Sequence, residues 1–214
     1  MFLGLDKKER DRIAVIDDSG ESMTYGDLCD FSEEFKNHLP KRSLIFLMAE
    51  NRNGSLLGYI ACLSNGIVPL ILSAKTEESL YASLYNLYQP EYLWAPNEMV
   101  EKLGHEKVYE AHGYALLKTG NAPVAMHPDL ALLLPTSGST GSPKLVRHSL
   151  HNIEANADNV RRLFEMDGTE KAMAILPMHY TMGLSVIASH PLAGATLLLS
   201  GRSLVDKGFW TMLK

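Results

Sequence analysis

The apolar residues of this chain form short continuous runs that alternate with longer stretches of helical spacing. The continuous runs are typical of buried strands, which we expect at 12–18, 43–49, 67–72 and 91–95. Between them apolar residues recur every three or four positions, as at Leu28, Phe31 and Phe35, with Thr24 as the expected N-cap. This alternation predicts an α/β fold with a largely parallel sheet.

The second half of the chain resumes the same pattern after an irregular stretch. Residues 97–128 suggest a short helix, a hairpin and a loop, with a weak internal boundary near 119–128. Further strands are expected at 129–135, 171–176 and 195–200, and helices at 152–164, at 181–190 and from Ser203. In the helix at 152–164, Ile153, Ala157, Val160 and Phe164 share one face.

Helical spacing continues to Lys214, and no Gly or Pro stop signal follows it. We therefore expect residues 1–214 to be the N-terminal portion of a longer domain, and a short C-terminal helix is the alternative.

Composition and charge exclude several classes of partner. The formal net charge is −5 and no polybasic block is present, so nucleic acid and anionic membranes are not expected as partners. No apolar run is long enough to cross a bilayer, and the N-terminal residues lack a signal-peptide core. Cys29 and Cys62 stand apart in apolar segments, as reduced cysteines do. A cytoplasmic location is expected.

A Gly/Ser/Thr-rich loop follows the apolar run at 132–135 in the stretch "LLLPTSGSTGSPKLV" (132–146). A loop after a buried parallel strand lies at the carboxyl edge of the sheet, where α/β proteins bind ligands. Its glycines allow successive N–H groups to form an anion-binding nest, its hydroxyls add donors, and a lysine adds positive charge. These features predict a site for a polyphosphate with Mg²⁺. The expected binding residues are Thr136, Ser137, Gly138, Ser139, Thr140, Gly141 and Lys144.

Other interpretations of this loop fit less well. A Walker A loop requires Gly before its lysine and Ser or Thr after it, whereas Pro143 and Leu145 flank Lys144. The dinucleotide fingerprint lacks its third glycine. A flexible linker is the bland alternative, but linkers rarely lie between two strongly apolar segments.

The stretch 136–144 resembles the phosphate loop of the adenylate-forming superfamily, whose signature is T-S-G-[ST]-T-G-x-P-K-G. Nine of the ten elements match, and Leu145 replaces the final glycine. That superfamily includes acyl-CoA and aryl-CoA synthetases, peptide-synthetase adenylation domains and luciferases. The segments "AVIDDSGESMTYGDL" (14–28) and 46–72 resemble its opening units. "ILPMHYTMGL" (175–184) resembles its L-P-x-x-H-x-x-G-L motif, with Tyr180 at the usual His position.

The resemblance implies a two-step reaction. A carboxylic acid attacks the α-phosphate of ATP to give an acyl-adenylate and pyrophosphate, and a thiol of coenzyme A or a phosphopantetheine carrier then accepts the acyl group. The loop would hold the β- and γ-phosphates, with the Thr140 hydroxyl at Mg²⁺. His179, Tyr180 and Gly183 would line the acid pocket. A half-buried aromatic pair is the structural alternative for His179 and Tyr180.

Other parts that the resemblance implies lie outside this sequence. These are a Y-G-x-T-E segment, an aspartate for the ribose, and a C-terminal domain with a catalytic lysine. We therefore assign no catalytic residue here and expect this chain to be inactive without the missing C-terminal portion. The alternative is a nucleotide-binding or assembly module without catalysis.

His148 and His151 lie three residues apart. A metal-binding pair is conceivable, but no third ligand adjoins them in the sequence, which favours polar residues at a helix entry.

Overall fold

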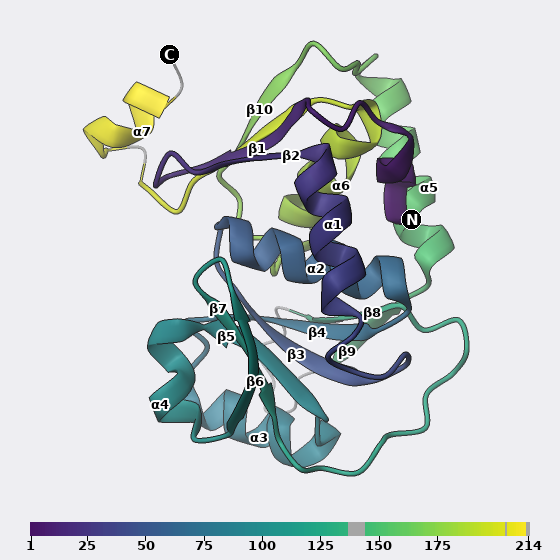
Figure 1. Cartoon of the computed structure of the whole chain (residues 1–214), viewed down its shortest axis with the longest axis vertical. Coiled ribbons are helices and arrows are strands. Elements are labelled where there is room, and N and C mark those ends of the chain that lie inside the picture. Colours follow the sequence, from purple (N-terminus) through teal and green to yellow (C-terminus); the bar gives the residue numbers. More distant parts are fainter. Residues whose placement is uncertain (137–143, 204, 213–214) are drawn as a thin grey trace.

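The computed structural model describes residues 1–136, 144–203 and 205–212. In these parts of the chain the strands form two sheets, with helices packed between them (Figure 1). The larger sheet has the order β6 (Glu106–Ala111), β7 (Tyr114–Lys118), β5 (Tyr92–Pro96), β3 (Leu44–Ala49), β4 (Val68–Ser73), β8 (Leu132–Pro135) and β9 (Leu145–His148). The smaller has the order β10 (Lys171–Ala174), β11 (Thr196–Leu199), β1 (Ile13–Asp17) and β2 (Ser22–Thr24).

The inner strands of both sheets run parallel. Strand β3 pairs in parallel with β4 and β5, β4 pairs in parallel with β8, and β11 pairs in parallel with β1 and β10. Antiparallel pairs occur toward the edges, where hairpins add β6–β7, β9 and β2. The predicted α/β class with a largely parallel sheet is confirmed. Its division into two sheets was not predicted.

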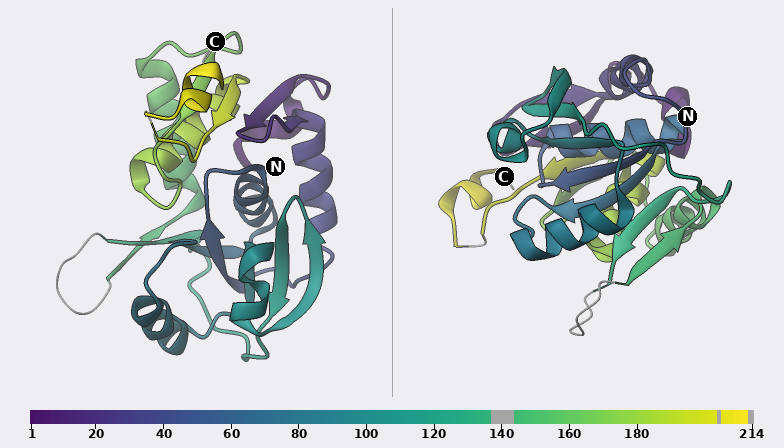
Figure 2. Two further views of the ribbon diagram at one scale, coloured as in Figure 1. Left: turned by 90° about the vertical axis from the view of Figure 1, so that its left-hand side faces the viewer. Right: turned by 90° about the horizontal axis from the view of Figure 1, so that it is seen from below.

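Helices cover both faces of the larger sheet. Helices α1 and α2 lie between the two sheets, whereas α3 covers the opposite face of the larger one (Figures 1 and 2). Helix α6 packs against β10, β11 and α5. The helices are η1 (Phe2–Lys7), α1 (Tyr25–Phe35), α2 (Asn53–Asn65), α3 (Glu78–Tyr88), η2 (Asn97–Met99), α4 (Val100–Leu103), α5 (Leu150–Leu163), α6 (Thr181–Ala193) and α7 (Lys207–Met212).

Strand β3 shows why a continuous apolar run indicates a strand covered on both faces. Ile45 and Leu47 belong to the core between the sheets, whereas Phe46 and Met48 belong to the core beneath α3. All four side chains are at most 1% exposed. Side chains of a strand alternate between its faces, so both faces must be apolar when helices cover both.

Two helix boundaries confirm local signals in the sequence. Thr24 caps α1, because its Oγ1 accepts a hydrogen bond from the Asp27 N–H, while the Asp27 carboxylate accepts one from the Thr24 N–H. Gly66 ends α2 with φ of 67°, a left-handed conformation that glycine adopts without steric cost.

Residues near the predicted loop depart from expectation. No strand was predicted at 145–148, but these residues form β9 and pair with β8. Helix α5 begins after its N-cap Ser149 and ends at Leu163, so Phe164 falls outside the predicted face and is 65% exposed. The stretch 119–131 contains no helix or strand, which agrees with the predicted loop, and the internal boundary near 119–128 stays a prediction.

Both cysteines are buried and free, and burial raises the pKa of each thiol, so they act as small apolar side chains. Among the described residues, no helix is long and apolar enough to cross a membrane.

Candidate active site

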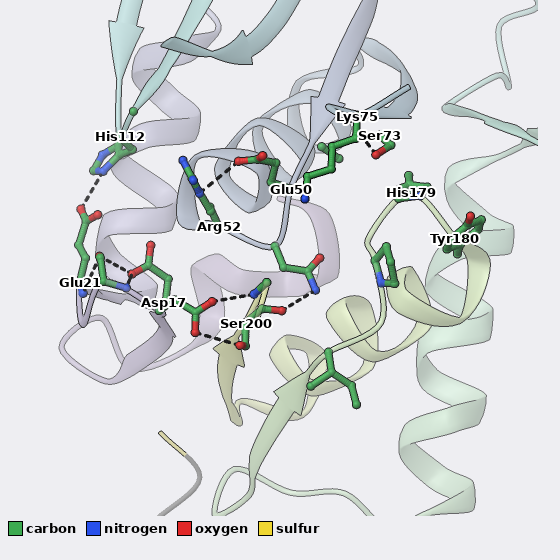
Figure 3. A pocket seen from close by; sticks show the side chains of 18 residues that line it. Asp17, Glu21, Glu50, Arg52, Ser73, Lys75, His112, His179, Tyr180 and Ser200 are labelled. Carbon is green, nitrogen blue, oxygen red and sulfur yellow. Dashed lines mark hydrogen bonds and ion pairs between the residues drawn. The ribbon is translucent and has the colours of Figure 1, made fainter. Parts of the chain in front are cut away.

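A cleft of about 840 Å³ lies where the carboxyl ends of strands from both sheets meet (Figure 3). The smaller sheet contributes the residues that follow β1, β10 and β11, and the larger sheet those that follow β3 and β4. The lining residues are Asp17, Asp18, Ser19, Glu21, Ala49, Glu50, Asn51, Arg52, Ser73, Lys75, His112, Gly113, Ile175, Pro177, His179, Tyr180, Ser200 and Gly201. Ligands of α/β proteins bind at such carboxyl edges.

The position between β3 and β4 is a topological switch point. The chain leaves β3 through 50–52 toward α2, whose apolar side chains join the core between the sheets. It leaves β4 through 74–77 toward α3, whose Leu84 joins the core on the other face. Because the two connections diverge to opposite faces, a crevice opens between the strand ends, as is typical of α/β binding sites.

Acidic and basic side chains of the cleft are mostly paired. Arg52 forms ion pairs with Glu50 (3.1 Å) and Glu98 (3.2 Å), and His112 Nδ1 lies 3.1 Å from Glu21 Oε1 (Figure 3). Lys75 is exposed, and among the described residues it has no ion-pair partner. Its ammonium is therefore available to an anionic ligand.

The Asp18 carboxylate orders the floor of the cleft next to β11. It accepts hydrogen bonds from Ser200 Oγ (2.9 Å) and the Gly201 N–H (2.7 Å), and it forms an ion pair with Arg202 at 3.1 Å. These contacts tie the end of β1 to the end of β11 over more than 180 residues of sequence. They fix the relative positions of two strand ends that line the cleft.

The predicted acid-pocket residues lie on one side of this cleft. His179 and Tyr180 both line it, with ring centroids 4.3 Å apart (Figure 3). Half-burial lowers the pKa of His179, because the charged imidazolium loses hydration, so the ring is neutral at neutral pH. Tyr180 is 54% exposed. Gly183 is buried and is not among the lining residues, so its contact with substrate stays a prediction.

Thr136 and Lys144 stand at the ends of β8 and β9, at the base of the predicted phosphate loop. The Thr136 N–H donates to the Lys144 carbonyl over 2.9 Å, and both residues are exposed. Leu70 of β4 pairs with Leu133 of β8, so Thr136 lies level with Ser73 of the cleft. The other expected loop residues, Ser137, Gly138, Ser139, Thr140 and Gly141, lie outside the described residues, and with them the expected magnesium ligand Thr140.

The histidine pair stands at a helix entry, as the sequence favoured, because His148 precedes the N-cap Ser149 and His151 lies in the first turn of α5. His148 belongs to β9 and His151 to α5, and burial lowers the pKa of His148. Across 1–136, 144–203 and 205–212, no group of three His, Cys, Asp or Glu side chains could hold a metal ion.

Six charged residues of the cleft were not identified from the sequence: Asp17, Asp18, Glu21, Glu50, Arg52 and Lys75. Glu50, Arg52 and Lys75 lie within three residues of the ends of the predicted buried strands 43–49 and 67–72, which is the signal that could have identified them.

Comparison with known proteins identifies the family. The profile of the family described as AMP-binding enzyme matches residues 5–214. This chain belongs to the AMP-binding enzyme family. Among curated relatives, the sulfoacetate–CoA ligase of Cupriavidus necator is 35% identical over 80 residues, which make up 37% of this chain and 16% of the ligase.

Solved structures share the fold at low sequence identity. Apo MatB from Rhodopseudomonas palustris has a TM-score of 0.73 and 20% identity, over 92% of this chain and 44% of that one. MenE from Bacillus subtilis in complex with ATP and magnesium has a TM-score of 0.72 and 19% sequence identity, over 94% of this chain and 57% of that one. VinN in complex with L-aspartate has a TM-score of 0.72 and 20% sequence identity, over 92% of this chain and 59% of that one. The chain thus spans about half the length of these proteins.

Proposed function

We propose that the protein containing this chain activates a carboxylic acid with ATP as an acyl-adenylate and then transfers the acyl group to a thiol. The observation that carries the proposal is the cleft at the switch point of β3 and β4. Strand β8, which bears the predicted phosphate loop, lies directly beside β4. This arrangement supports a site for the acid and a site for the phosphates at one sheet edge.

Two lysines can meet an anionic ligand, although the carboxylates of the cleft lining, Asp17, Asp18, Glu21 and Glu50, outnumber its cations Arg52 and Lys75. Lys75 offers an ammonium without a carboxylate partner among the described residues, and Lys144 stands at the base of the loop. We expect Lys144 and the loop N–H groups to hold the phosphates that leave as pyrophosphate. A Mg²⁺ ion bound to the phosphates offsets their charge and needs only one or two protein oxygens, which the Thr140 hydroxyl can supply.

The relatives support the classes of substrate. One is named as a CoA ligase, one solved structure holds ATP with magnesium, and another holds L-aspartate, a small carboxylic acid. We propose coenzyme A or a phosphopantetheine carrier as the thiol acceptor. The cytoplasmic location also stays a prediction.

The test is ATP–pyrophosphate exchange by the full-length parent with a panel of small carboxylic acids. We expect exchange that depends on one class of acid and on Mg²⁺. Nucleotide binding without exchange for any acid would favour the non-catalytic binding module instead.

Residues 1–214 alone should not catalyse this exchange. The segments that the family resemblance implies for adenine, ribose and the catalytic lysine are not within this sequence. The assay compares the isolated chain with a protein-free blank and with the full-length parent. Acid-dependent exchange by the isolated chain above the blank would show that the missing segments are not required.

Replacing Tyr180 by alanine in the full-length parent should change the preference among acids more than the affinity for ATP. Tyr180 lines the cleft with an exposed ring beside His179, so it can contact the acid. Steady-state KM values for several acids and for ATP measure the effect. Met182→Ala is the matched control, since Met182 lies in the first turn of α6, which Tyr180 precedes as the N-cap, and is exposed but does not line the cleft. If ATP affinity falls while acid preference is unchanged, Tyr180 does not contact the acid and the prediction is wrong.

A further inference from the structure

Asn51 makes an unusual set of contacts between the two sheets. Its side chain, 8% exposed, follows β3 of the larger sheet. The amide nitrogen lies within hydrogen-bonding distance of three backbone carbonyls, those of Ala174 (3.0 Å), Leu176 (3.2 Å) and Ser200 (3.1 Å). The amide oxygen accepts from the Met178 N–H at 3.2 Å. One side chain therefore reaches four backbone groups.

All four partners belong to strand ends or connections of the smaller sheet. Ala174 ends β10, Ser200 follows β11, and Leu176 and Met178 lie in the connection from β10 to α6. The bonds span 123 to 149 residues of sequence. Asn51 thus holds the carboxyl ends of two strands of one sheet against the carboxyl end of a strand of the other.

The connection 175–180 carries His179 and Tyr180 and has little other support. Ile175 and Leu176 are each 42% exposed, and the Tyr180 N–H bonds locally to the Pro177 carbonyl. Among the described residues, the hydrogen bonds that tie Leu176 and Met178 to the rest of the chain come from Asn51. Burial of the Met178 side chain is the other anchor.

We propose that Asn51 is a positioning residue of the acid pocket, which sets where His179 and Tyr180 stand relative to the switch point of β3 and β4. The role in acid selection rests on the proposed function, whereas the role in ordering the connection does not. Asparagine suits the position because one amide both donates and accepts. An aspartate would keep the acceptor for Met178 but turn a carboxylate oxygen toward three carbonyl oxygens.

The first experiment measures hydrogen exchange of the full-length parent by mass spectrometry. In Asn51→Ala, we expect peptides covering 174–180 to exchange at least about tenfold faster, because the Met178 N–H and the carbonyl anchors lose their partner. Asn65→Ala is the matched control. Its amide also bonds two carbonyls, those of Ser32 (2.8 Å) and Ala61 (2.9 Å), but away from the cleft. Unchanged exchange of 174–180 in Asn51→Ala would overturn the proposal.

Asn51→Ser provides a milder variant if the alanine variant fails to fold. Its hydroxyl is too short to reach all four backbone groups, so exchange over 174–180 should again rise while the rest of the chain stays protected. An increase spread evenly over all peptides would mean that Asn51 only contributes to overall stability, which contradicts the proposal.

The second experiment measures kinetics with two acids of different length. We expect Asn51→Ser to raise KM for the preferred acid about tenfold and to change the ratio of kcat/KM between the acids, with KM for ATP little changed. A lower kcat with an unchanged acid ratio would overturn the positioning role. If the wild-type parent activates no acid at all, the proposed function fails, and the exchange experiment still decides whether Asn51 orders the connection.

Discussion

Replacing Lys144 by alanine in the full-length parent should slow acyl-adenylate formation about a hundredfold. Negative charge develops on the phosphate oxygens as pyrophosphate leaves, and losing one charged donor to such oxygens costs on the order of 3 kcal/mol. The bond between the Thr136 N–H and the Lys144 carbonyl closes the base of the loop through the backbone, so the substitution leaves this closure in place. Thr140→Val should have an effect of similar size, because it removes one hydroxyl donor from the same loop.

The two half-reactions separate this role from a structural one. Transfer of the acyl group from preformed acyl-adenylate should be much less affected, because pyrophosphate has already left. Lys171→Ala is the control, since Lys171 is exposed at the opposite, amino end of β10. If Lys144→Ala lowers the rates of both half-reactions equally, the loop stabilises the fold and does not hold the phosphates.

The order of elements could be predicted because each element has a local signal. The apolar run of β3 fills cores on both of its faces, and the cap at Thr24 needs only the residue three positions later. The division into two sheets has no such signal. It depends on β1 pairing with β11, and the hydrogen bond from Thr196 Oγ1 to the Ile13 carbonyl spans 183 residues. A strand buried in either sheet has the same apolar pattern.

Strand β9 was missed for a related reason. Its four residues, Leu145 to His148, are too few to distinguish a strand from the first turn of a helix. The antiparallel pairing with β8 makes these residues a strand, and the four residues themselves carry no signal of that pairing.

Some residues of the candidate site also have a local signal in the sequence, whereas their arrangement around one cleft does not. His179 and Tyr180 were identified by a motif, and they line the cleft. Lys75 and Arg52 follow buried strands, so the sequence places them at a sheet edge. That the ends of both sheets converge on one cleft, with Asn51 between them, follows only from long-range pairing.

Gly183→Ala should destabilise the chain by about 3 kcal/mol, against the usual trend. In a helix, alanine normally stabilises relative to glycine by roughly 0.5–1 kcal/mol. Here a Cβ on Gly183 would lie 2.2 Å from the Pro177 carbonyl oxygen and 2.9 Å from that of Leu176. Both are backbone atoms, so the first turn of α6 or the connection before it must move, and overpacking of this kind costs about 1–3 kcal/mol.

Thermal unfolding of residues 1–214 followed by circular dichroism measures the effect of Gly183→Ala. At roughly 2–4 °C per kcal/mol for a chain of this size, we expect Tm to fall by about 6–12 °C. Ser83→Ala, at an exposed position of α3, is the control for helix propensity and should change stability by less than about 0.5 kcal/mol. In the full-length parent the displaced Pro177 segment should also alter acid preference, because it carries His179 and Tyr180. An unchanged Tm would mean that α6 can move away from Pro177 without cost, and that this glycine is needed for another reason.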